Sequence, residues 1–225
     1  MKVDGKVSII ILNWNRCDEL EKTISLLEYQ SYKNVEIIVV DNASSDNSVE
    51  MLKRKFAHIK LICLASNLGC EEGFNVGILN SNGEYLLFLD NDASIENTGI
   101  EKSIQEFKKN NKLGILDIRV YNTKSNKIIN ESEGWPIKNH FCGCVVFFRS
   151  EVFSKIGLRP SEFFIYTSEA EISLRVIDAG YEILHTTEII GFHRESPKKR
   201  LSSNFFYFYT RNSIWLIWKF YPIIS

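Results

Sequence analysis

Several features that would assign a chain to a broad class at once are missing from this sequence. With a net charge of −1 at pH 7, it lacks the excess of basic residues that a general nucleic-acid binder carries. The apolar stretch from Ile214 to Ile217 is too short to span a bilayer. We therefore expect no nucleic-acid partner and no membrane-spanning helix at this stretch.

A paired set of cysteines and a secretory leader are missing as well. The five cysteines are odd in number and several lie in apolar runs, which does not favour a disulfide framework. Cys142 and Cys144 form a close pair, but no second pair completes a zinc site, so we interpret them as small buried residues. Met1 leads into a short apolar strand with no leader-like region or cleavage site. We expect a cytoplasmic chain.

The sequence does contain a regular alternation of strand and helix patterns. With 225 residues and 44% hydrophobic content, the chain can bury one sizeable core. Continuous apolar runs predict strands covered on both faces at 7–12, 35–40, 59–64 and 85–89. Apolar residues at helical spacing lie between these runs. This order predicts an α/β fold with a doubly wound, mostly parallel sheet through about residue 90.

Polar residues follow each of the four predicted strands. They occupy positions 13–16, 41–42, 66–67 and 90–92. Right-handed crossovers place the carboxyl ends of parallel strands at one edge, and such sheets bind ligands in the crevice outside that edge. The sequence therefore predicts the ligand site there.

The second half of the chain is less regular. A helix is predicted around Ile104, and the pattern then becomes irregular over 113–139, which indicates a hairpin or a loop excursion. Beyond it we predict a buried strand at 143–149, a helix at 169–179 and a strand at 181–184 before the apolar run that ends at His193.

Asp90 and Asp92 carry the clearest chemistry. Both carboxylates emerge directly from a predicted buried strand at the ligand edge. Hard oxygen ligands of this kind suit Mg²⁺ or Mn²⁺, which keep open positions for diphosphate oxygens. An Asp-x-Asp in a loop also caps turns, but its position at a strand end favours the metal.

A family resemblance rests on four segments in register: VSIIILNWNR (7–16), VEIIVVDNASSD (35–46), NLG (67–69) with GFNVG (73–77), and GEYLLFLDND (83–92). Their order and spacing resemble the family 2 glycosyltransferases, in particular the rhamnosyltransferase-like branch, and the likeness covers nearly the whole chain. It implies the nucleotide-diphosphosugar transferase fold called GT-A, an inverting reaction, and a divalent metal cofactor, Mn²⁺ or Mg²⁺.

The resemblance also implies a donor site in the first half of the chain. By this resemblance, the residues expected to bind the nucleotide sugar are Leu12, Asn13, Trp14, Asn15, Asp41, Asn67, Asn75, Asp90 and Asn91. The metal ligands are Asp92, His193 and Asp90. For Trp14, simple core packing is an equal alternative to stacking on the nucleotide, and Asp41 has a helix-capping alternative.

An acceptor site is implied in the second half. The resemblance implies that Glu169 is the catalytic base. The family usually has Glu-Asp at this point, with the aspartate as the base, and this chain has Ser168-Glu169. Its alternative is a solvated acid at a helix start. The acceptor residues are Trp135, Gly143 and Glu171, with specificity in the excursion 121–139.

The domain assignment follows. Residues 1–193 form one catalytic domain, with a nucleotide-binding half at 1–92 and an acceptor half at 93–193. The tail 194–225 is basic and aromatic, and either docks on the core or lies at an anionic lipid surface. The expected partners are a UDP- or dTDP-sugar donor and a glycan, lipid-linked or small-molecule acceptor.

Two rival functions remain. A sugar nucleotidyltransferase normally has a glycine-rich phosphate loop after the first strand, and positions 13–17 contain no glycine. A catalytically inactive sugar-nucleotide-binding module is the other rival, and the Ser168-Glu169 departure leaves it open.

Overall fold

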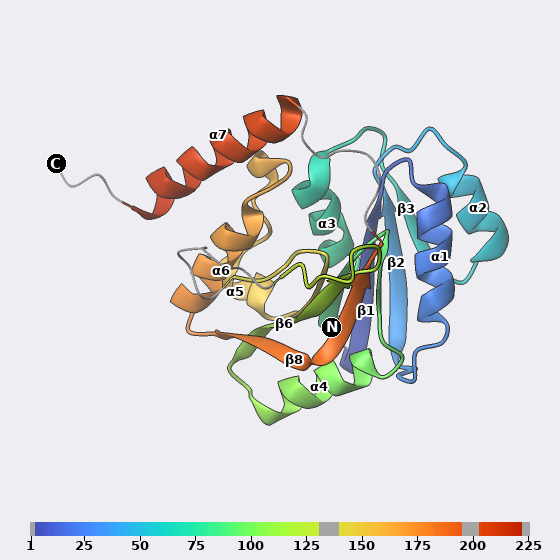
Figure 1. The fold of residues 1–225 in the computed structure, drawn as a ribbon, viewed down its shortest axis with the longest axis horizontal. Coiled ribbons are helices and arrows are strands. Elements are labelled where there is room, and N and C mark those ends of the chain that lie inside the picture. The colour runs from blue at the N-terminus through green and yellow to red at the C-terminus, as the bar shows by residue number, and fades with distance from the viewer. Residues whose placement is uncertain (1–2, 131–139, 195–202, 222–225) are drawn as a thin grey trace.

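One eight-stranded sheet runs through the molecule in the computed structural model, which describes residues 3–130, 140–194 and 203–221 (Figure 1). The strand order is β3-β2-β1-β4-β7-β6-β8-β5. The strands are β1 (Val3–Asn13), β2 (Val35–Asp41), β3 (Lys60–Cys63), β4 (Gly83–Asp90), β5 (Ala93–Ile95), β6 (Leu113–Asn122), β7 (Val145–Arg149) and β8 (Glu182–His193). The helices are α1 (Cys17–Leu27), α2 (Ser48–Lys55), α3 (Gly69–Leu79), α4 (Gly99–Lys109), α5 (Val152–Ile156), α6 (Ser168–Asp178), α7 (Ser203–Phe220) and the short 3₁₀ helix η1 (Ser161–Phe163).

The first half of the sheet is parallel and doubly wound, as predicted. Strands β3, β2, β1 and β4 pair in parallel. The chain moves outward from β1 to β3 and then returns through α3 to pair β4 with the other side of β1. The winding direction therefore reverses at β1, and the crevice at the carboxyl ends of β1, β2 and β4 is the ligand position expected of such a sheet.

The second half of the sheet is mixed. Strand β7 runs antiparallel to both β4 and β6, β8 is parallel to β6, and the short β5 pairs antiparallel with the end of β8. Two predictions need correction here. The segment predicted as a hairpin or loop excursion from Leu113 begins with the ten-residue strand β6, and a hairpin follows, with an antiparallel bridge between Tyr121 and Ile128. The two runs predicted around 181–193 form one strand, β8, with a register shift opposite Ile118 and Arg119.

Two apolar layers cover the sheet. One face packs against α1, α2 and α4, and the other packs against α3, α5 and α6. Helix α3 lies especially close to β1, because a Cβ atom added at Gly77 would fall 2.3 Å from Ile10 Cγ2, and one added at Gly73 would fall 2.4 Å from Leu12 Cδ1. These glycines let α3 and its preceding loop sit directly against the carboxyl end of β1.

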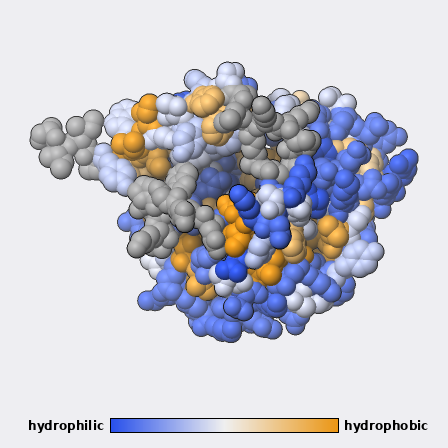
Figure 2. Space-filling model, viewed as in Figure 1, coloured by the Kyte–Doolittle hydropathy of each residue, from blue (hydrophilic) through white to orange (hydrophobic). Residues whose placement is uncertain are grey.

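Helix α7 stands apart from these layers. It lies along the outside of the loop that precedes α6, at the upper left of Figure 1. Several of its apolar side chains face solvent, including Ile214 at 59% exposure and Trp218 at 74%, and apolar residues are visible on this part of the surface in Figure 2. Among the described residues, no helix combines the length and apolarity that crossing a bilayer requires.

Candidate active site

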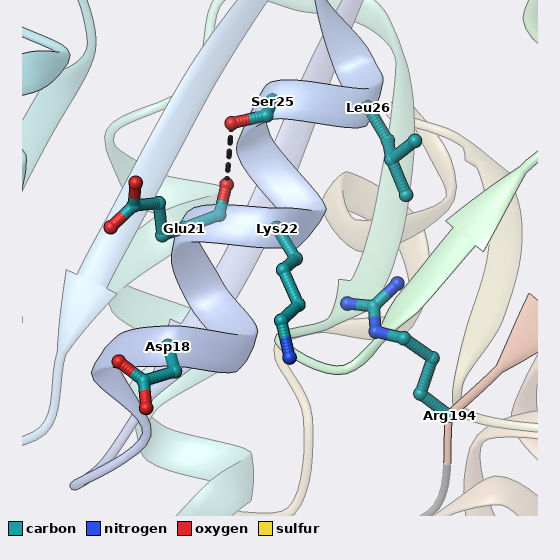
Figure 3. Close-up of a pocket in the computed structure, with 6 residues that line it drawn as sticks. All are labelled: Asp18, Glu21, Lys22, Ser25, Leu26 and Arg194. Atoms are coloured by element: carbon teal, nitrogen blue, oxygen red, sulfur yellow. Dashed lines mark hydrogen bonds between the residues drawn. The ribbon is translucent and has the colours of Figure 1, made fainter.

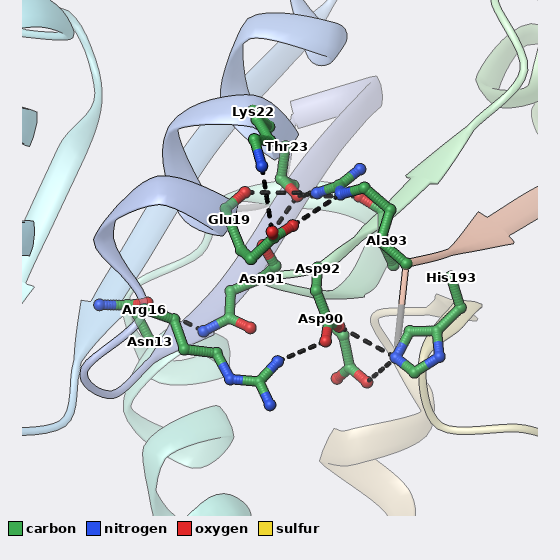
Figure 4. A network of polar contacts seen from close by, with 11 residues as sticks. Asn13, Arg16, Glu19, Lys22, Thr23, Asp90, Asn91, Asp92, Ala93 and His193 are labelled. Carbon is green, nitrogen blue, oxygen red and sulfur yellow. Dashed lines mark hydrogen bonds and ion pairs between the residues drawn. The ribbon is translucent and has the colours of Figure 1, made fainter. Parts of the chain in front are cut away.

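Three metal-ligating side chains converge at the carboxyl edge of the sheet (Figure 4). Asp90 ends β4, Asp92 follows two residues later, and His193 ends β8, where its pairing with Ala93 of β5 places it beside the acidic pair. One ligand atom from each of the three lies within 4.8 Å of the others. The structure thus joins residues that are about one hundred positions apart in the sequence.

Asp92 is a buried carboxylate that contacts an imidazole and a guanidinium. It is 3% exposed, with Arg16 Nη1 on its Oδ2 atom and His193 Nε2 at 2.9 Å from its Oδ1 atom. Burial opposes ionisation, but the His193 imidazole and the Arg16 guanidinium outweigh it and lower the pKa of Asp92 to about 2. Asp92 is therefore ionised at neutral pH, as a metal ligand must be.

His193 fits the same role. Its Nε2 atom is buried and has no hydrogen-bond partner of acceptable geometry in the described part of the chain, although it also lies 3.8 Å from Asp90 Oδ2. A buried polar atom without a hydrogen bond is costly unless another partner binds it. Two carboxylates and one imidazole suit Mn²⁺ or Mg²⁺, so the residues present fit the implied cofactor.

A buried polar network joins the ends of β1, β2 and β4 next to the acidic group. Asn13 Nδ2 donates to Asp41 Oδ1 at 3.1 Å, and Asn91 Nδ2 donates to Asn13 Oδ1 at 2.9 Å. The second oxygen of Asp41 accepts the Ser44 N–H at 2.8 Å. These bonds hold Asn13, Asp41 and Asn91 together at the carboxyl edge of the sheet, and their contact with a donor stays a prediction.

Three other predicted donor residues, at the end of β1 and just after it, differ in their surroundings. Trp14 is 54% exposed, which does not fit core packing and leaves its ring free to stack. Asn15 has a positive φ of 53° and accepts the Ser45 N–H at 2.7 Å, so it shapes the loop. Leu12 points toward α3 and packs against the second apolar layer.

Two other predicted donor residues have structural partners. Asn67 Oδ1 accepts from Asn42 Nδ2 at 3.0 Å and from the Gly69 N–H at 2.9 Å, which closes the loop before α3. Asn75 is buried and pairs its side-chain amide with the backbone of Arg159 at 2.9 and 3.0 Å. Their contact with a donor stays a prediction.

Glu169 lies close to the acidic group through Gly143. Asp90 N donates to Cys144 O at 2.9 Å, and a Cβ atom added at the preceding Gly143 would fall 2.6 Å from Glu169 Oε1. The Glu169 carboxylate therefore lies against the turn that precedes β7, one residue before the Cys144 carbonyl that Asp90 contacts. The predicted base Glu169 and the predicted acceptor residue Gly143 thus lie next to each other and close to Asp90, and their roles stay predictions.

The remaining acceptor predictions have other outcomes. Glu171 is fully buried, and its carboxylate contacts Arg175 at 2.7 Å and Lys219 at 2.6 Å, which ties α6 to α7. Its acceptor contact stays a prediction. Trp135 falls outside the described residues.

Arg16 and Arg159, to which the sequence assigned no role, contact residues of the site or of the helices that border it. Arg16 neutralises Asp92, and Arg159 forms a buried ion pair with Glu71 at 2.8 Å beneath α6. Arg194 binds Glu19 and Thr23, so it anchors the chain leaving β8 to α1. Arg16 had a signal in the sequence, because it ends the polar run 13–16 after the first strand, and Arg159 had none.

A shallow groove lies on the outer face of α1, beside Arg194 (Figure 3). Its volume is about 570 Å³, and it is lined by Asp18, Glu21, Lys22, Ser25, Leu26 and Arg194. It carries both acidic and basic side chains, and none of the metal-ligating side chains lines it. The chemistry of the site is therefore at the sheet edge and not in this groove.

These features are those of an α/β enzyme with a candidate metal site at the carboxyl edge of its sheet, and sequence comparison names the family. Residues 8–159 match the model of glycosyl transferase family 2, so the chain belongs to that family. The chain is 35% identical over 139 residues to glycosyltransferase GlyA of Streptococcus pneumoniae, covering 60% of this chain and 18% of that protein. It spans 18% to 43% of the length of three curated relatives that it matches.

Solved structures agree on the fold. Residues 1–349 of S. aureus TarS, in complex with UDP-GlcNAc, superpose with a TM-score of 0.70 at 15% identity, covering 90% of this chain and 64% of that one. The mannosyltransferase PcManGT of Pyrobaculum calidifontis, in complex with GDP-Man and Mn²⁺, gives 0.67 at 18% identity, covering 87% and 58%. The fold is GT-A, as the resemblance implied. The rhamnosyltransferase-like branch stays a prediction.

Proposed function

We propose that this chain transfers a sugar from a nucleotide-diphosphate sugar to an acceptor hydroxyl, with inversion, in the synthesis of a glycan or glycoconjugate. One observation carries the proposal: Asp90, Asp92 and His193 form a cluster of metal-ligating side chains, Asp90 N donates to Cys144 O, and the Glu169 carboxylate lies against the neighbouring Gly143. In this proposal, the site that holds the diphosphate and the site that activates the hydroxyl are therefore close together. The family match supports this reading but ends before Glu169 and His193.

In this proposal the donor lies across the carboxyl ends of β1, β2 and β4. Asp41 and Asn13 hold the base and ribose, and the exposed ring of Trp14 covers the base. Asp92, His193 and Asp90 hold Mn²⁺ or Mg²⁺, which supplies charge neutralisation for the departing diphosphate. UDP and dTDP are the proposed nucleotides. The neighbours solved with UDP-GlcNAc and with GDP-Man and Mn²⁺ support the donor class.

Glu169 is the proposed base. Its carboxylate takes the proton from the acceptor hydroxyl as that oxygen bonds to the anomeric carbon, and the bond from this carbon to the diphosphate oxygen breaks on the opposite side. The electron pair leaves with the nucleoside diphosphate. The single displacement inverts the anomeric centre. Trp135 and the excursion 121–139 remain the proposed acceptor-specificity region, with a glycan, lipid-linked or small-molecule acceptor.

The experiment measures nucleoside diphosphate release from candidate donors in the presence of Mn²⁺ and an acceptor extract. Glu169→Gln keeps the shape of the side chain but cannot accept the proton, so we expect kcat to fall about 100- to 10,000-fold. Glu169→Asp restores the residue that is usual in the family and should retain most of the activity. Glu188→Gln, at an exposed position of β8, is the matched control and should leave kcat unchanged. Full activity in Glu169→Gln would remove Glu169 from the mechanism.

The second candidate is an inactive sugar-nucleotide-binding module, favoured by Ser168 where the family has an acid. It predicts donor binding with neither transfer nor hydrolysis by the wild-type chain. The same assay separates the two, because a binding module releases no nucleoside diphosphate at any donor concentration.

We further propose that α7 rests on an anionic lipid surface at the cytoplasmic face of the membrane. The tail 194–225 has six basic residues against one acid, and Tyr207, Ile214 and Trp218 are at least 59% exposed. Co-sedimentation with phosphatidylserine-containing vesicles tests this contact. Trp218→Ser should weaken binding and Leu79→Ser, at an exposed position of α3, should not. Equal binding to neutral vesicles would contradict it.

A further inference from the structure

The segment between η1 and α6 has an unusual backbone. Phe164, Tyr166 and Thr167 have φ values of 63°, 70° and 70°, a region that residues with large or β-branched side chains rarely adopt. This segment leads directly into the first turn of α6, where Glu169 is the second residue. A strained backbone next to the proposed base must be held by contacts from elsewhere in the molecule.

Those contacts come from α7 and α3, and they reach five consecutive carbonyl oxygens. Arg211 Nη2 donates to the carbonyls of residues 162 and 163 at 2.8 and 2.9 Å. Asn212 Nδ2 donates to the carbonyls of residues 163, 165 and 166 at 3.0, 2.8 and 2.9 Å. The remaining carbonyl, at 164, accepts the N–H groups of Cys70 and Glu71 at 2.6 and 3.3 Å.

Asn212 is the centre of this arrangement. It is fully buried, and it is the buried residue of α7, a helix whose aromatic and aliphatic side chains are largely exposed. Its amide oxygen accepts from Arg211 Nε at 3.0 Å, which aims both N–H bonds at the loop. A helix that docked for apolar burial alone would place a leucine or phenylalanine at this point. The polar residue indicates that α7 docks to satisfy the loop backbone.

Aromatic packing fixes the orientation of the pair. Phe164 stacks on Phe208 with ring centroids 5.0 Å apart, and the Arg211 guanidinium lies 4.4 Å from the Trp215 ring centroid. On the other side, Gly69 has a φ of 87°, and a Cβ atom there would fall 2.5 Å from the Phe164 ring. The loop is therefore held between α3 and α7.

We propose that Asn212, with Arg211, is a positioning residue that holds the 163–167 segment in its strained conformation and so places Glu169 beside Gly143 and the metal-ligating side chains. This inference rests on the proposed function for its catalytic consequence. Its physical basis is independent of that function. If the hydrogen bonds from Asn212 are lost, the strained residues relax, and the first turn of α6 shifts with them.

The test compares Asn212→Asp, which keeps the shape but cannot donate, with Asn204→Ala, which removes an exposed asparagine from the first turn of the same helix. Asn212→Ala serves as a second variant in case the new carboxylate prevents α7 from docking. We expect kcat to fall about 10- to 100-fold, since a misplacement of about 1 Å costs rate on this scale. The KM for the donor should change less than twofold, because the donor site is on other elements.

A second readout is amide hydrogen exchange of the full chain. Peptides covering 163–169 should exchange faster in Asn212→Asp and Asn212→Ala, with no change in β1 or β4, and Asn204→Ala should match wild type. Unchanged exchange in this segment, or an unchanged kcat with faster exchange, would overturn the positioning role. If the wild-type chain turns over no donor at all, the proposed function fails, and exchange alone decides whether Asn212 holds the loop.

Discussion

At the scale of single residues, the two oxygens of Asp92 face different partners. The Oδ1 atom faces His193 Nε2 at 2.9 Å, and the Oδ2 atom faces Arg16. Asp90, Asp92 and His193 would hold the cation, and Arg16 contacts the Asp92 oxygen that does not face His193. Arg16 therefore balances the buried charge of Asp92 through that oxygen, and its guanidinium is partly exposed.

Gly143 offers a residue-scale prediction. A methyl group added there would fall 2.6 Å from Glu169 Oε1. The three atoms nearest to it all belong to the Glu169 side chain. Gly143→Ala should therefore displace the carboxylate and lower kcat about 10- to 100-fold, with the urea midpoint of unfolding almost unchanged. In a Glu169→Asp background, where the side chain is shorter, the same substitution should cost less. Equal losses in both backgrounds would contradict a steric effect on this carboxylate.

Residues of the site were predictable from the sequence where they follow a strand. Asp41, Asp90 and Asp92 could be located because a buried apolar run ends at each of them and the topology collects these ends at one edge. His193 needed the family resemblance, because no local pattern links it to Asp90. The partners of Glu171 were not predictable, since they depend on how α6 and α7 pack. Arg159 and Asn212 had no local signal at all.

At the scale of elements, the buried Glu71 of α3 pairs with Arg159 in the loop before η1 and accepts a hydrogen bond from Ser168 at the start of α6. Glu71 is 1% exposed and Arg159 is 5% exposed, and Ser168 Oγ donates to the other oxygen of Glu71 at 2.7 Å. Burial raises the pKa of Glu71, with Arg159 opposing the shift and the nearby Glu169 adding to it. The contact links the helix that borders the donor site to the helix that carries the proposed base.

Removing one partner of this pair should be costly. Glu71→Gln leaves the Arg159 guanidinium buried without its counter-charge, so we expect a loss of about 3–5 kcal/mol in the free energy of unfolding. The double variant Glu71→Gln with Arg159→Met should lose less than Glu71→Gln alone. Urea denaturation measures both, and Glu106→Gln, which breaks an exposed ion pair on α4, should change stability by less than about 1 kcal/mol. A small effect of Glu71→Gln would mean that water or another group satisfies Arg159.

Elements with uniform apolar runs were predicted well, and those with buried polar residues were not. Strand β6 was missed because Asp117 interrupts its apolar pattern. In the structure this aspartate is 3% exposed, and its oxygens accept from Cys142 N at 3.0 Å and contact His185 Nδ1 at 2.7 Å. Both partners are distant in sequence, so tertiary contacts decide the strand. The mixed pairing of the second half was unpredictable for the same reason.

At the scale of the whole molecule, the site lies where two differently built halves of one sheet meet. The parallel half supplies Asp41, Asp90 and Asp92 from strand ends, and the mixed half supplies His193 from β8 and Glu169 from α6. Strands β4 and β7 pair along the seam and bring Asp90 next to Cys144. The division into a nucleotide-binding half and an acceptor half stays a prediction, which donor and acceptor binding to the same chain would test.

The central claim is that this edge binds a nucleoside diphosphate through a divalent metal. The most direct measurement is the melting temperature of the chain with UDP, dTDP or GDP, each with and without Mn²⁺, for wild type, Asp92→Asn and the exposed-site control Asp178→Asn. At ligand concentrations of 100 Kd we expect one diphosphate to raise the melting temperature of wild type and Asp178→Asn by about 5–10 °C, only with Mn²⁺. Asp92→Asn should show no such rise. A rise that is independent of Mn²⁺, or that persists in Asp92→Asn, would contradict the assignment of the metal-binding donor site.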